Sequence, residues 1–428
     1  MIILFYITYI MRVFTYLQSV LKTSTFTPKR VYLDYAAATP LHSKVYAAMI
    51  PYFTEYIGNP SAIHKEGVQL RAVIEECRTA VARTLSVRGD LVTFTSGGTE
   101  ANNIAILGYV RTLLNEGVLA KEMEIVSLET EHPATLEALK EVEKLGVQVH
   151  FASCLEDGRV NIDSFAALVN ERTVLVTIAY INSEIGVIQP IRQLSKLVRS
   201  IQSKWKDILP HPCLHIDAAQ APLWESCNME QLGADAISLD ASKFEGPRSS
   251  GVYACSRRQW SKQGMLYGGA QESGKRPGTE SPAAIVGLSV ALSRAQKQYE
   301  ETARRVKEER DMLLTELLYR DTYPLKDMLL LNGSETHRVA NNINISLPGY
   351  DTEYLAIYLD NKGFAVSTKS ACSSQDSAAS SVVFAVTGDS ERARSTLRIT
   401  LGPNTRWRHI QAIPKHIVDF VQLQDKIK

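Results

Sequence analysis

The stretch that decides the fold is "LVTFTSGGTEANNIAI", residues 91–106. Its β-branched and aromatic start predicts a short strand at 91–95, and its end predicts a helix. The turn between them, Ser96-Gly97-Gly98-Thr99, combines glycines with unpaired helix N–H groups and can hold an anion such as phosphate. No Gly-Lys-Ser/Thr follows, which excludes a Walker A loop, and an ordinary capped turn stays open.

The same alternation of strand and helix continues to about residue 255. Further strands are predicted at 124–128, 173–181, 213–217, 236–240 and 251–255. Alternating strands and helices imply parallel strands joined by crossover helices, and the nearly continuous apolar run "TVLVTI" fits a strand covered on both faces. We therefore predict an α/β fold with a mainly parallel sheet and flanking helices.

The pattern changes after residue 280. Ser281-Pro282 can open a long charged helix that runs to about 319. Strand-like 341–347, helix-like 352–363 and strand-like 396–401 follow. We predict a large α/β domain over 31–280 and a smaller α+β domain over 281–428.

Residues 1–30 are expected to be an extension outside this core. Arg12 interrupts their apolar run, so no uncharged stretch reaches the length of about 20 residues that a membrane span needs. A basic start and a small-residue cleavage site are also missing, which argues against a secretory signal. No membrane association is expected.

Charge and cysteine content narrow the function further. Lys plus Arg number 47 and Asp plus Glu 46, a balance that argues against a nucleic-acid or polybasic membrane binder. The six cysteines form no C-x-x-C pair and no zinc-like cluster with histidine, so neither a metal site nor a disulfide framework is expected. A reducing cytoplasm fits this usage.

Several residues whose side chains could take part in catalysis or binding follow the predicted strands, where open α/β sheets bind ligands. His132 follows 124–128, Asp217 ends 213–217 with Gln220 in the next turn, and Lys243 follows 236–240. Alone, each has an ordinary role as a cap, a core residue or a surface lysine. Together with the glycine turn they are the parts of a pyridoxal-phosphate (PLP) site: a phosphate cradle, a ring-facing imidazole, an acid for the pyridine nitrogen and a Schiff-base lysine.

A cysteine in an unusual setting adds to these parts. Cys372 lies in "AVSTKSACSS", 365–374, among serines and three residues after Lys369. Buried cysteines usually have apolar neighbours, so this thiol is expected to be accessible.

Ten blocks of sequence carry a resemblance that spans residues 31–405. They are "VYLDYAAATP", "GNPSAIHKEG", "TFTSGGTEANNIAI", "ETEHPATLEAL", "INSEIGVIQPI", "HIDAAQ", "DASKFEGPRSSGVY", "GGAQESGKRPGTES", "STKSACSS" and "TLRITLG". In this order they resemble the NifS/IscS-like cysteine desulfurases of the class V aminotransferase family, which are PLP-dependent enzymes of fold type I.

The resemblance implies roles around the cofactor ring. Lys243 matches the lysine that holds the cofactor covalently, and His132 matches the histidine stacked on the ring. Asp217 matches the acid that keeps the ring nitrogen protonated, and Gln220 matches the amide near the phenolic oxygen.

At the phosphate the resemblance implies Thr99 and the amides around Gly98. Thr279 matches a threonine that reaches the phosphate of the neighbouring subunit, which implies a homodimer.

For the substrate, L-cysteine, the resemblance implies that Arg398 binds the carboxylate and that Asn182 and Ser183 lie nearby. Cys372 matches the nucleophile that takes the substrate sulfur as a persulfide and leaves L-alanine. The sulfur then passes to an acceptor protein of iron–sulfur cluster assembly or tRNA thiolation. The alternative is a selenocysteine lyase or another class V aminotransferase or lyase.

Four positions depart from the family pattern. Ser242 replaces the histidine that is usual in the family, Asp240 replaces a serine, and Ser183 replaces an asparagine. Ser249-Ser250 replaces a glycine-containing turn. Because a carboxylate would repel the phosphate, Asp240 is expected to point elsewhere while Ser242 supplies the hydroxyl.

Overall fold

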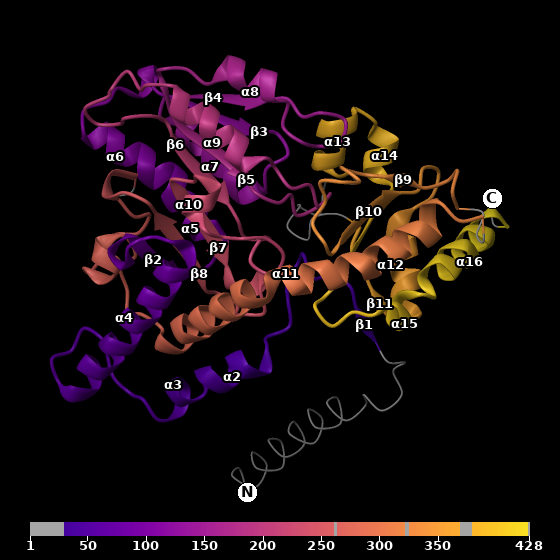
Figure 1. The fold of residues 1–428 in the computed structure, drawn as a ribbon, viewed down its shortest axis with the longest axis horizontal. Coiled ribbons are helices and arrows are strands. Elements are labelled where there is room, and N and C mark those ends of the chain that lie inside the picture. Colours follow the sequence, from indigo (N-terminus) through magenta and orange to yellow (C-terminus); the bar gives the residue numbers. More distant parts are fainter. Residues whose placement is uncertain (1–29, 261–262, 322–324, 369–378, 427–428) are drawn as a thin grey trace, which may run out of the picture.

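A central sheet of seven strands organises the larger part of the molecule (Figure 1). The computed structural model describes residues 30–260, 263–321, 325–368 and 379–426. The strands lie in the order β2-β8-β7-β6-β5-β3-β4. Their bounds are β2 (Val92–Thr95), β3 (Glu124–Leu128), β4 (Gln148–Ala152), β5 (Thr173–Ala179), β6 (Cys213–Asp217), β7 (Ala236–Asp240) and β8 (Gly251–Cys255).

The sheet is parallel except for β8, which runs antiparallel to both of its neighbours, β7 and β2. The prediction of a mainly parallel sheet is therefore confirmed. The reversal follows from the short link between β7 and β8, because an antiparallel neighbour needs no crossover helix. The sequence prediction missed β4, an edge strand in which Ala152 alone is buried and the other four residues are exposed or half-buried.

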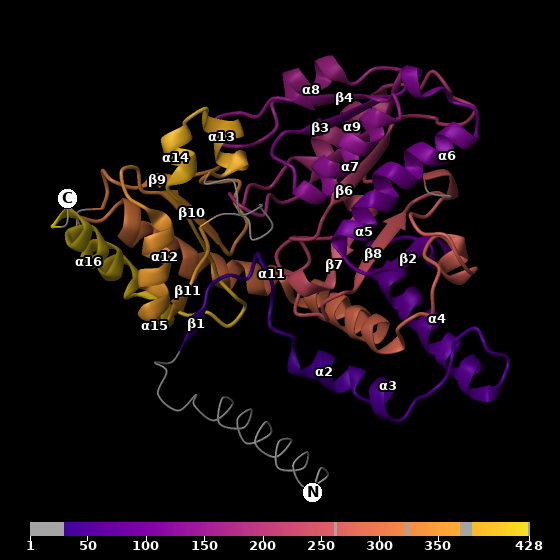
Figure 2. The ribbon, with the colours of Figure 1, turned by 180° about the vertical axis from the view of Figure 1, so that it is seen from behind.

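Helices cover both faces, because successive side chains of each strand point to opposite sides. On β8, Val252 and Ala254 join one apolar cluster, whereas Tyr253 and Cys255 join the other. The first cluster is completed by α4 (Lys65–Leu85), α9 (Ile191–Ser200) and α11 (Pro282–Leu318). The second is completed by α5 (Gly98–Asn103), the π-helical η2 (Ile104–Gly108), α6 (Tyr109–Asn115) and α7 (Pro133–Lys144) (Figure 2).

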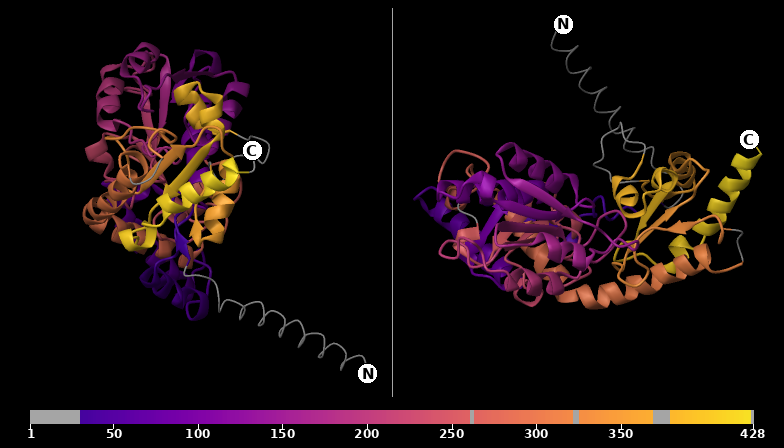
Figure 3. Two further views of the ribbon diagram at one scale, coloured as in Figure 1. Left: turned by 90° about the vertical axis from the view of Figure 1, so that its right-hand side faces the viewer. Right: turned by 90° about the horizontal axis from the view of Figure 1, so that it is seen from above.

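A smaller sheet lies at the other end of α11, which runs along one side of both parts (Figure 3). Its order is β12-β10-β9 and it is antiparallel. Its strands are β9 (Leu330–Leu331), β10 (Asn342–Ser346) and β12 (Thr396–Thr400). The helices of this part are α12 (Thr352–Asn361), α13 (Ser381–Thr387), α14 (Ser390–Arg394), α15 (Trp407–Ile410) and α16 (Ile413–Asp425).

The beginning of the described chain also lies against this smaller part. β1 (Val31–Tyr32) pairs in parallel with β11 (Phe364–Ala365), and Asp34 forms a bridge to Thr400. The chain then passes between the two parts before it enters α2 (Ser43–Met49) (Figure 1). The division into domains at residue 280 stays a prediction, and this pairing ties residues 31–34 to the C-terminal side.

The remaining elements are short and connect the main ones. They are α2 (Ser43–Met49), α3 (Pro51–Thr54), α8 (Ile162–Leu168), α10 (Met229–Leu232), η1 (Gly89–Leu91), η3 (Ala120–Glu122), η4 (Ala241–Lys243), η5 (Arg258–Trp260) and η6 (Gln271–Gly274). Within the described part of the chain, no helix is both long and apolar enough to cross a membrane.

Candidate active site

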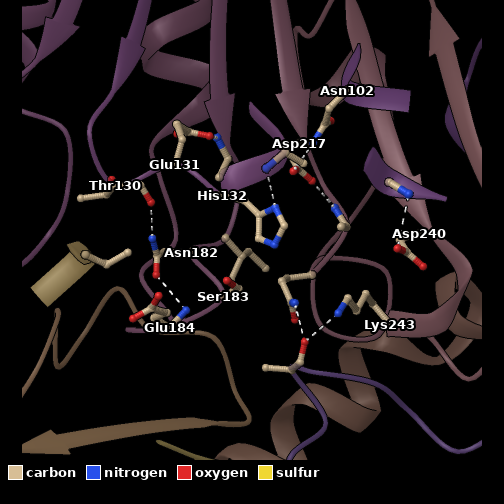
Figure 4. A pocket seen from close by; sticks show the side chains of 18 of the residues that line it. Asn102, Thr130, Glu131, His132, Asn182, Ser183, Glu184, Asp217, Asp240 and Lys243 are labelled. Atoms are coloured by element: carbon tan, nitrogen blue, oxygen red, sulfur yellow. Dashed lines mark hydrogen bonds between the residues drawn. The ribbon is translucent and has the colours of Figure 1, made fainter. Parts of the chain in front are cut away.

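A cavity of about 150 Å³, partly open to solvent, lies where the carboxyl ends of the parallel strands meet the smaller part (Figure 4). It gathers most of the predicted site residues from distant parts of the sequence. Those that line it are Gly98, Thr99, His132, Asn182, Ser183, Asp217, Gln220, Lys243 and Arg398. Ser242 and Thr279 are not among the lining residues, and Cys372 lies outside the described residues.

Lys243 ends the short helix η4 directly after β7, and its side chain lines the cavity. Its Nζ donates hydrogen bonds to the carbonyl oxygens of Ala36, at 3.1 Å, and Ala37. Gln220 Nε2 donates to the Ala36 carbonyl as well, at 2.9 Å. The loop after β1 therefore holds both the amine and the amide at the cavity wall.

Asp217 is the last residue of β6 and is nearly buried. Its Oδ2 accepts a hydrogen bond from Asn102 Nδ2 at 2.7 Å, and its Oδ1 accepts one from the Ala219 N–H at 3.0 Å. Sequence reasoning missed Asn102, which lies on α5 and also lines the cavity. Because these donors fix the carboxylate, it is positioned to accept from a cationic N–H group in the cavity.

His132 caps α7 and lines the cavity at the same time, so the cap and site interpretations are compatible. Its Nδ1 accepts from the Ala134 N–H at 3.1 Å. In the neutral ring this bond leaves the proton on Nε2.

The neighbouring Glu131 was not foreseen as a site residue. Its carboxylate is buried and accepts from the Ala179 N–H at 2.8 and 2.9 Å. Burial, together with the nearby charge of Asp217, raises the pKa of Glu131 to about 8. At neutral pH this acid therefore holds a proton.

Arg398 enters from β12 of the smaller sheet and is 2% exposed. Its Nη2 contacts Asp34 Oδ1 at 2.9 Å, and its Nη1 donates to the Ser183 carbonyl at 3.0 Å. Its Nε is buried and has no hydrogen-bond partner among the described residues. A buried guanidinium with an unused donor suits a carboxylate ligand.

Asn182 lines the cavity, but its side chain also holds the backbone together. Its Nδ2 donates to the Thr130 carbonyl at 2.8 Å, and its Oδ1 accepts from the N–H groups of Glu184 and Ile185 at 2.9 and 3.0 Å. A role for Asn182 in substrate contact stays a prediction.

The expectation for Asp240 and Ser242 is wrong in orientation. Asp240 lines the cavity, and its Oδ2 accepts from the Gly98 N–H at 3.3 Å. The Ser242 hydroxyl and N–H both donate to Asp240 Oδ1, at 2.6 and 2.9 Å. The reason is local: the N–H at the start of α5 and the N–H and hydroxyl of Ser242 are all donors within reach of the Asp240 carboxylate, which accepts from each of them.

Comparison with known proteins agrees with this fold and cavity. A family profile described as aminotransferase class-V matches residues 31–413. The mainly parallel sheet, with a lysine, an acid and an imidazole around one cavity, defines the same class of protein.

Similar proteins show which group within this class the chain resembles. The cysteine desulfurase IscS of Dictyoglomus turgidum is 38% identical over 87% of this chain and 90% of its own. The cysteine desulfurase IscS 1 of Archaeoglobus fulgidus is 33% identical over 87% and 91%. A solved NifS-like protein superposes with a TM-score of 0.81 at 27% identity, over 92% of this chain and all of the other. The chain belongs to the cysteine desulfurases of the class-V aminotransferase family.

Proposed function

We propose that this cysteine desulfurase holds PLP in the cavity through Lys243 and moves the sulfur of L-cysteine onto Cys372, with L-alanine as the other product. The observation that carries the proposal is the meeting of Lys243, Asp217 and His132 in one cavity with an arginine that has an unused donor. Bound PLP supplies an electron sink that lets bonds to the α- and β-carbons of an amino acid break.

The residues around the cavity fit such a group. Lys243 would bond its aldehyde, and Asp217, already fixed by Asn102, would accept the proton-bearing ring nitrogen. His132 would lie against the ring, and Gln220 would lie near the phenolic oxygen. The start of α5 at Gly98 would face the phosphate.

The same residues would handle the substrate. Arg398 lines the cavity and would bind the substrate carboxylate through Nη1 or Nη2, since each of these nitrogens has two N–H groups and uses one of them for the Ser183 carbonyl or for Asp34. Lys243 Nζ, which lines the cavity, would take the α-proton. Ser183 lies at the same wall, and its carbonyl already orients the guanidinium.

The sulfur step needs no outside oxidant. The Cys372 thiolate attacks the substrate sulfur and forms the sulfur–sulfur bond. The carbon–sulfur bond breaks, its electron pair stays with the β-carbon, and this carbon takes up a proton to become the methyl group of alanine. Chain connectivity supports this assignment. Ser367 exchanges backbone hydrogen bonds with Arg398, and Cys372 follows Thr368 by four residues, which span at most about 14 Å.

The other cysteines are unsuited to the task. Burial raises the thiol pKa of all five described cysteines, to about 11 for Cys154 and Cys255. A raised pKa disfavours the reactive thiolate. All five are free, which also supports our proposal of a reducing, cytoplasmic location.

A homodimer is part of the proposal. Thr279 is exposed and does not line the cavity of its own chain, as expected of a residue that serves a neighbouring subunit. Large apolar side chains around α3 are also exposed, with Phe53 at 67%, Ile57 at 74% and Ile63 at 95%. Such a patch is typical of a protein interface. Sedimentation of the purified protein tests this part, and a monomer would contradict it.

After the sulfur is loaded, we propose that the persulfide passes to an acceptor protein of iron–sulfur cluster assembly or tRNA thiolation. No observation favours the alternative of a selenocysteine lyase or another class V enzyme.

Incubation with L-cysteine, followed by assay of alanine and sulfide, tests the central claim. Wild type should form alanine and show the visible absorbance of bound PLP. Lys243→Ala should lose both, whereas Cys372→Ala should keep the absorbance and lose alanine formation. Equal alanine from wild type and Cys372→Ala would overturn the role of the thiol.

A further inference from the structure

The phosphate end of the cavity already contains a carboxylate. Asp240 ends β7, and its Oδ2 accepts from the Gly98 N–H at 3.3 Å (Figure 4). A methyl group added to Gly98 would lie 3.5 Å from this oxygen, and one added to Gly97 would lie 3.6 Å from it. The carboxylate therefore covers the glycine turn.

This position conflicts with a bound phosphate. The start of a helix attracts anions because its N–H groups are unpaired and its dipole is positive there. Asp240 has taken one of these N–H groups, and a phosphate group would bring one to two further negative charges to the same turn. A serine at this position, which is the family pattern, would be a neutral donor.

Compensating cations are few on this side of the cavity. Among the described residues that line it, the lysines and arginines are Lys243 and Arg398. Arg398 already contacts Asp34, and Lys243 is required for the cofactor aldehyde. The repulsion between Asp240 and a phosphate is therefore only partly offset by this chain.

Asp240 also has a second anchor. The Ser242 N–H and hydroxyl both donate to Oδ1 at 2.9 and 2.6 Å, so the carboxylate can release the long contact to Gly98 and stay bonded. A phosphate that binds the Gly98 N–H would need that release, because this group has a single hydrogen to donate.

We infer that Asp240 competes with the cofactor phosphate for the start of α5, so that this residue weakens the retention of PLP. The inference rests on the proposed function, in which PLP occupies this cavity. Removing the charge of Asp240 should tighten PLP binding, and the gain should depend on the phosphate.

The test is equilibrium binding of PLP and of pyridoxal, which lacks the phosphate, to the cofactor-free full-length protein. Asp240→Asn keeps a side-chain oxygen for the Ser242 N–H and removes the charge. We expect it to bind PLP about tenfold tighter than wild type, since contact between like charges inside a partly shielded site is strongly unfavourable. Its affinity for pyridoxal should not change.

Asp240→Ser, the family residue, is a second variant in case the first folds poorly, and it should also bind PLP more tightly. Asp351→Asn is the matched control. Asp351 caps α12 in the same manner, accepting from the Glu353 and Tyr354 N–H groups, and it does not line the cavity. This control should bind both compounds as wild type does.

Unchanged or weaker PLP binding in both Asp240 variants, or equal gains for PLP and pyridoxal, would overturn the inference. Failure of the proposed function looks different. In that case wild type would bind no PLP, or would bind it as well after Lys243→Ala.

Discussion

Replacing Glu131 by glutamine removes a buried acid and keeps its shape. The glutamine oxygen can still accept from the Ala179 N–H, which Glu131 contacts at 2.8 and 2.9 Å. Since glutamine does not titrate, the difference between the two proteins reports the ionisation of Glu131 alone. We expect this difference to depend strongly on pH.

The sign follows from the two pKa values. Burial and the charge of Asp217 raise the pKa of Glu131 in the folded protein from its ordinary 4.5 to about 8. Between these values the folded protein binds more protons than the unfolded chain, so wild-type stability falls as pH rises. At about 1.4 kcal/mol for each pH unit over this interval, the upper limit of the loss is about 5 kcal/mol.

The assay is thermal unfolding of Glu131→Gln and wild type from pH 5 to pH 9. The stability of the variant should match that of wild type most closely near pH 5. The variant should then become more stable relative to wild type up to about pH 8, above which the difference should stay constant. Glu137→Gln is the control, because Glu137 lies on the exposed side of α7 with its side chain 67% exposed. It should differ from wild type by little at any pH. A Glu131→Gln difference that stays flat from pH 5 to pH 9 would refute the reasoning.

Three further changes test other contacts. Arg398→Lys should raise the KM for L-cysteine about tenfold or more, because an ammonium cannot present the planar fork, while the PLP absorbance stays; an unchanged KM would remove Arg398 from the substrate site. Ser249→Gly should stabilise the protein by about 0.5–1 kcal/mol in denaturant unfolding. Ser249 has a φ of +57°, which costs a residue with a side chain about 1–2 kcal/mol, and the greater chain entropy that glycine loses on folding offsets part of the relief. A loss of stability would contradict this prediction. Glu272→Gln should destabilise the fold by about 3 kcal/mol in the same assay. Arg78 donates to both Glu272 oxygens at 2.7 Å, and the change leaves this arginine without its buried charged partner. Equal stability of the two proteins would argue against that ion pair.

Much of the fold was predictable because the strands are buried on both faces. The runs predicted at 124–128 and 213–217 agree with β3 and β6, and the helix predicted from 281 to 319 agrees with α11. β4 was missed because Gln148 and His150 interrupt its apolar residues, as the edge position of the strand allows, so no continuous apolar run marks it. The order of the strands and the reversal of β8 depend on contacts between distant segments, which local patterns do not contain.

The same limit applies to the site. The ends of parallel strands share one edge, so His132, Asp217 and Lys243 could be expected to meet. The residues that hold these side chains in place could not be predicted. Asn102 contacts Asp217 from 115 positions away, and Asp34 contacts Arg398 from 364 positions away. Neither pair leaves a signal in the local sequence.

The two ends of the cavity are built on a similar principle but differ in what a ligand must displace. At one end Asp34 holds Arg398, and at the other Asp240 holds the Gly98 N–H. Nη1 and Nη2 of the arginine each have a second N–H, so a substrate carboxylate can bind without removing Asp34. The Gly98 amide has a single hydrogen to donate, so a phosphate that binds this amide replaces the Asp240 carboxylate. The cost of internal pairing therefore falls on the cofactor rather than on the substrate, and variation at Asp240 should change PLP affinity while leaving the KM for L-cysteine in the PLP-saturated enzyme unchanged.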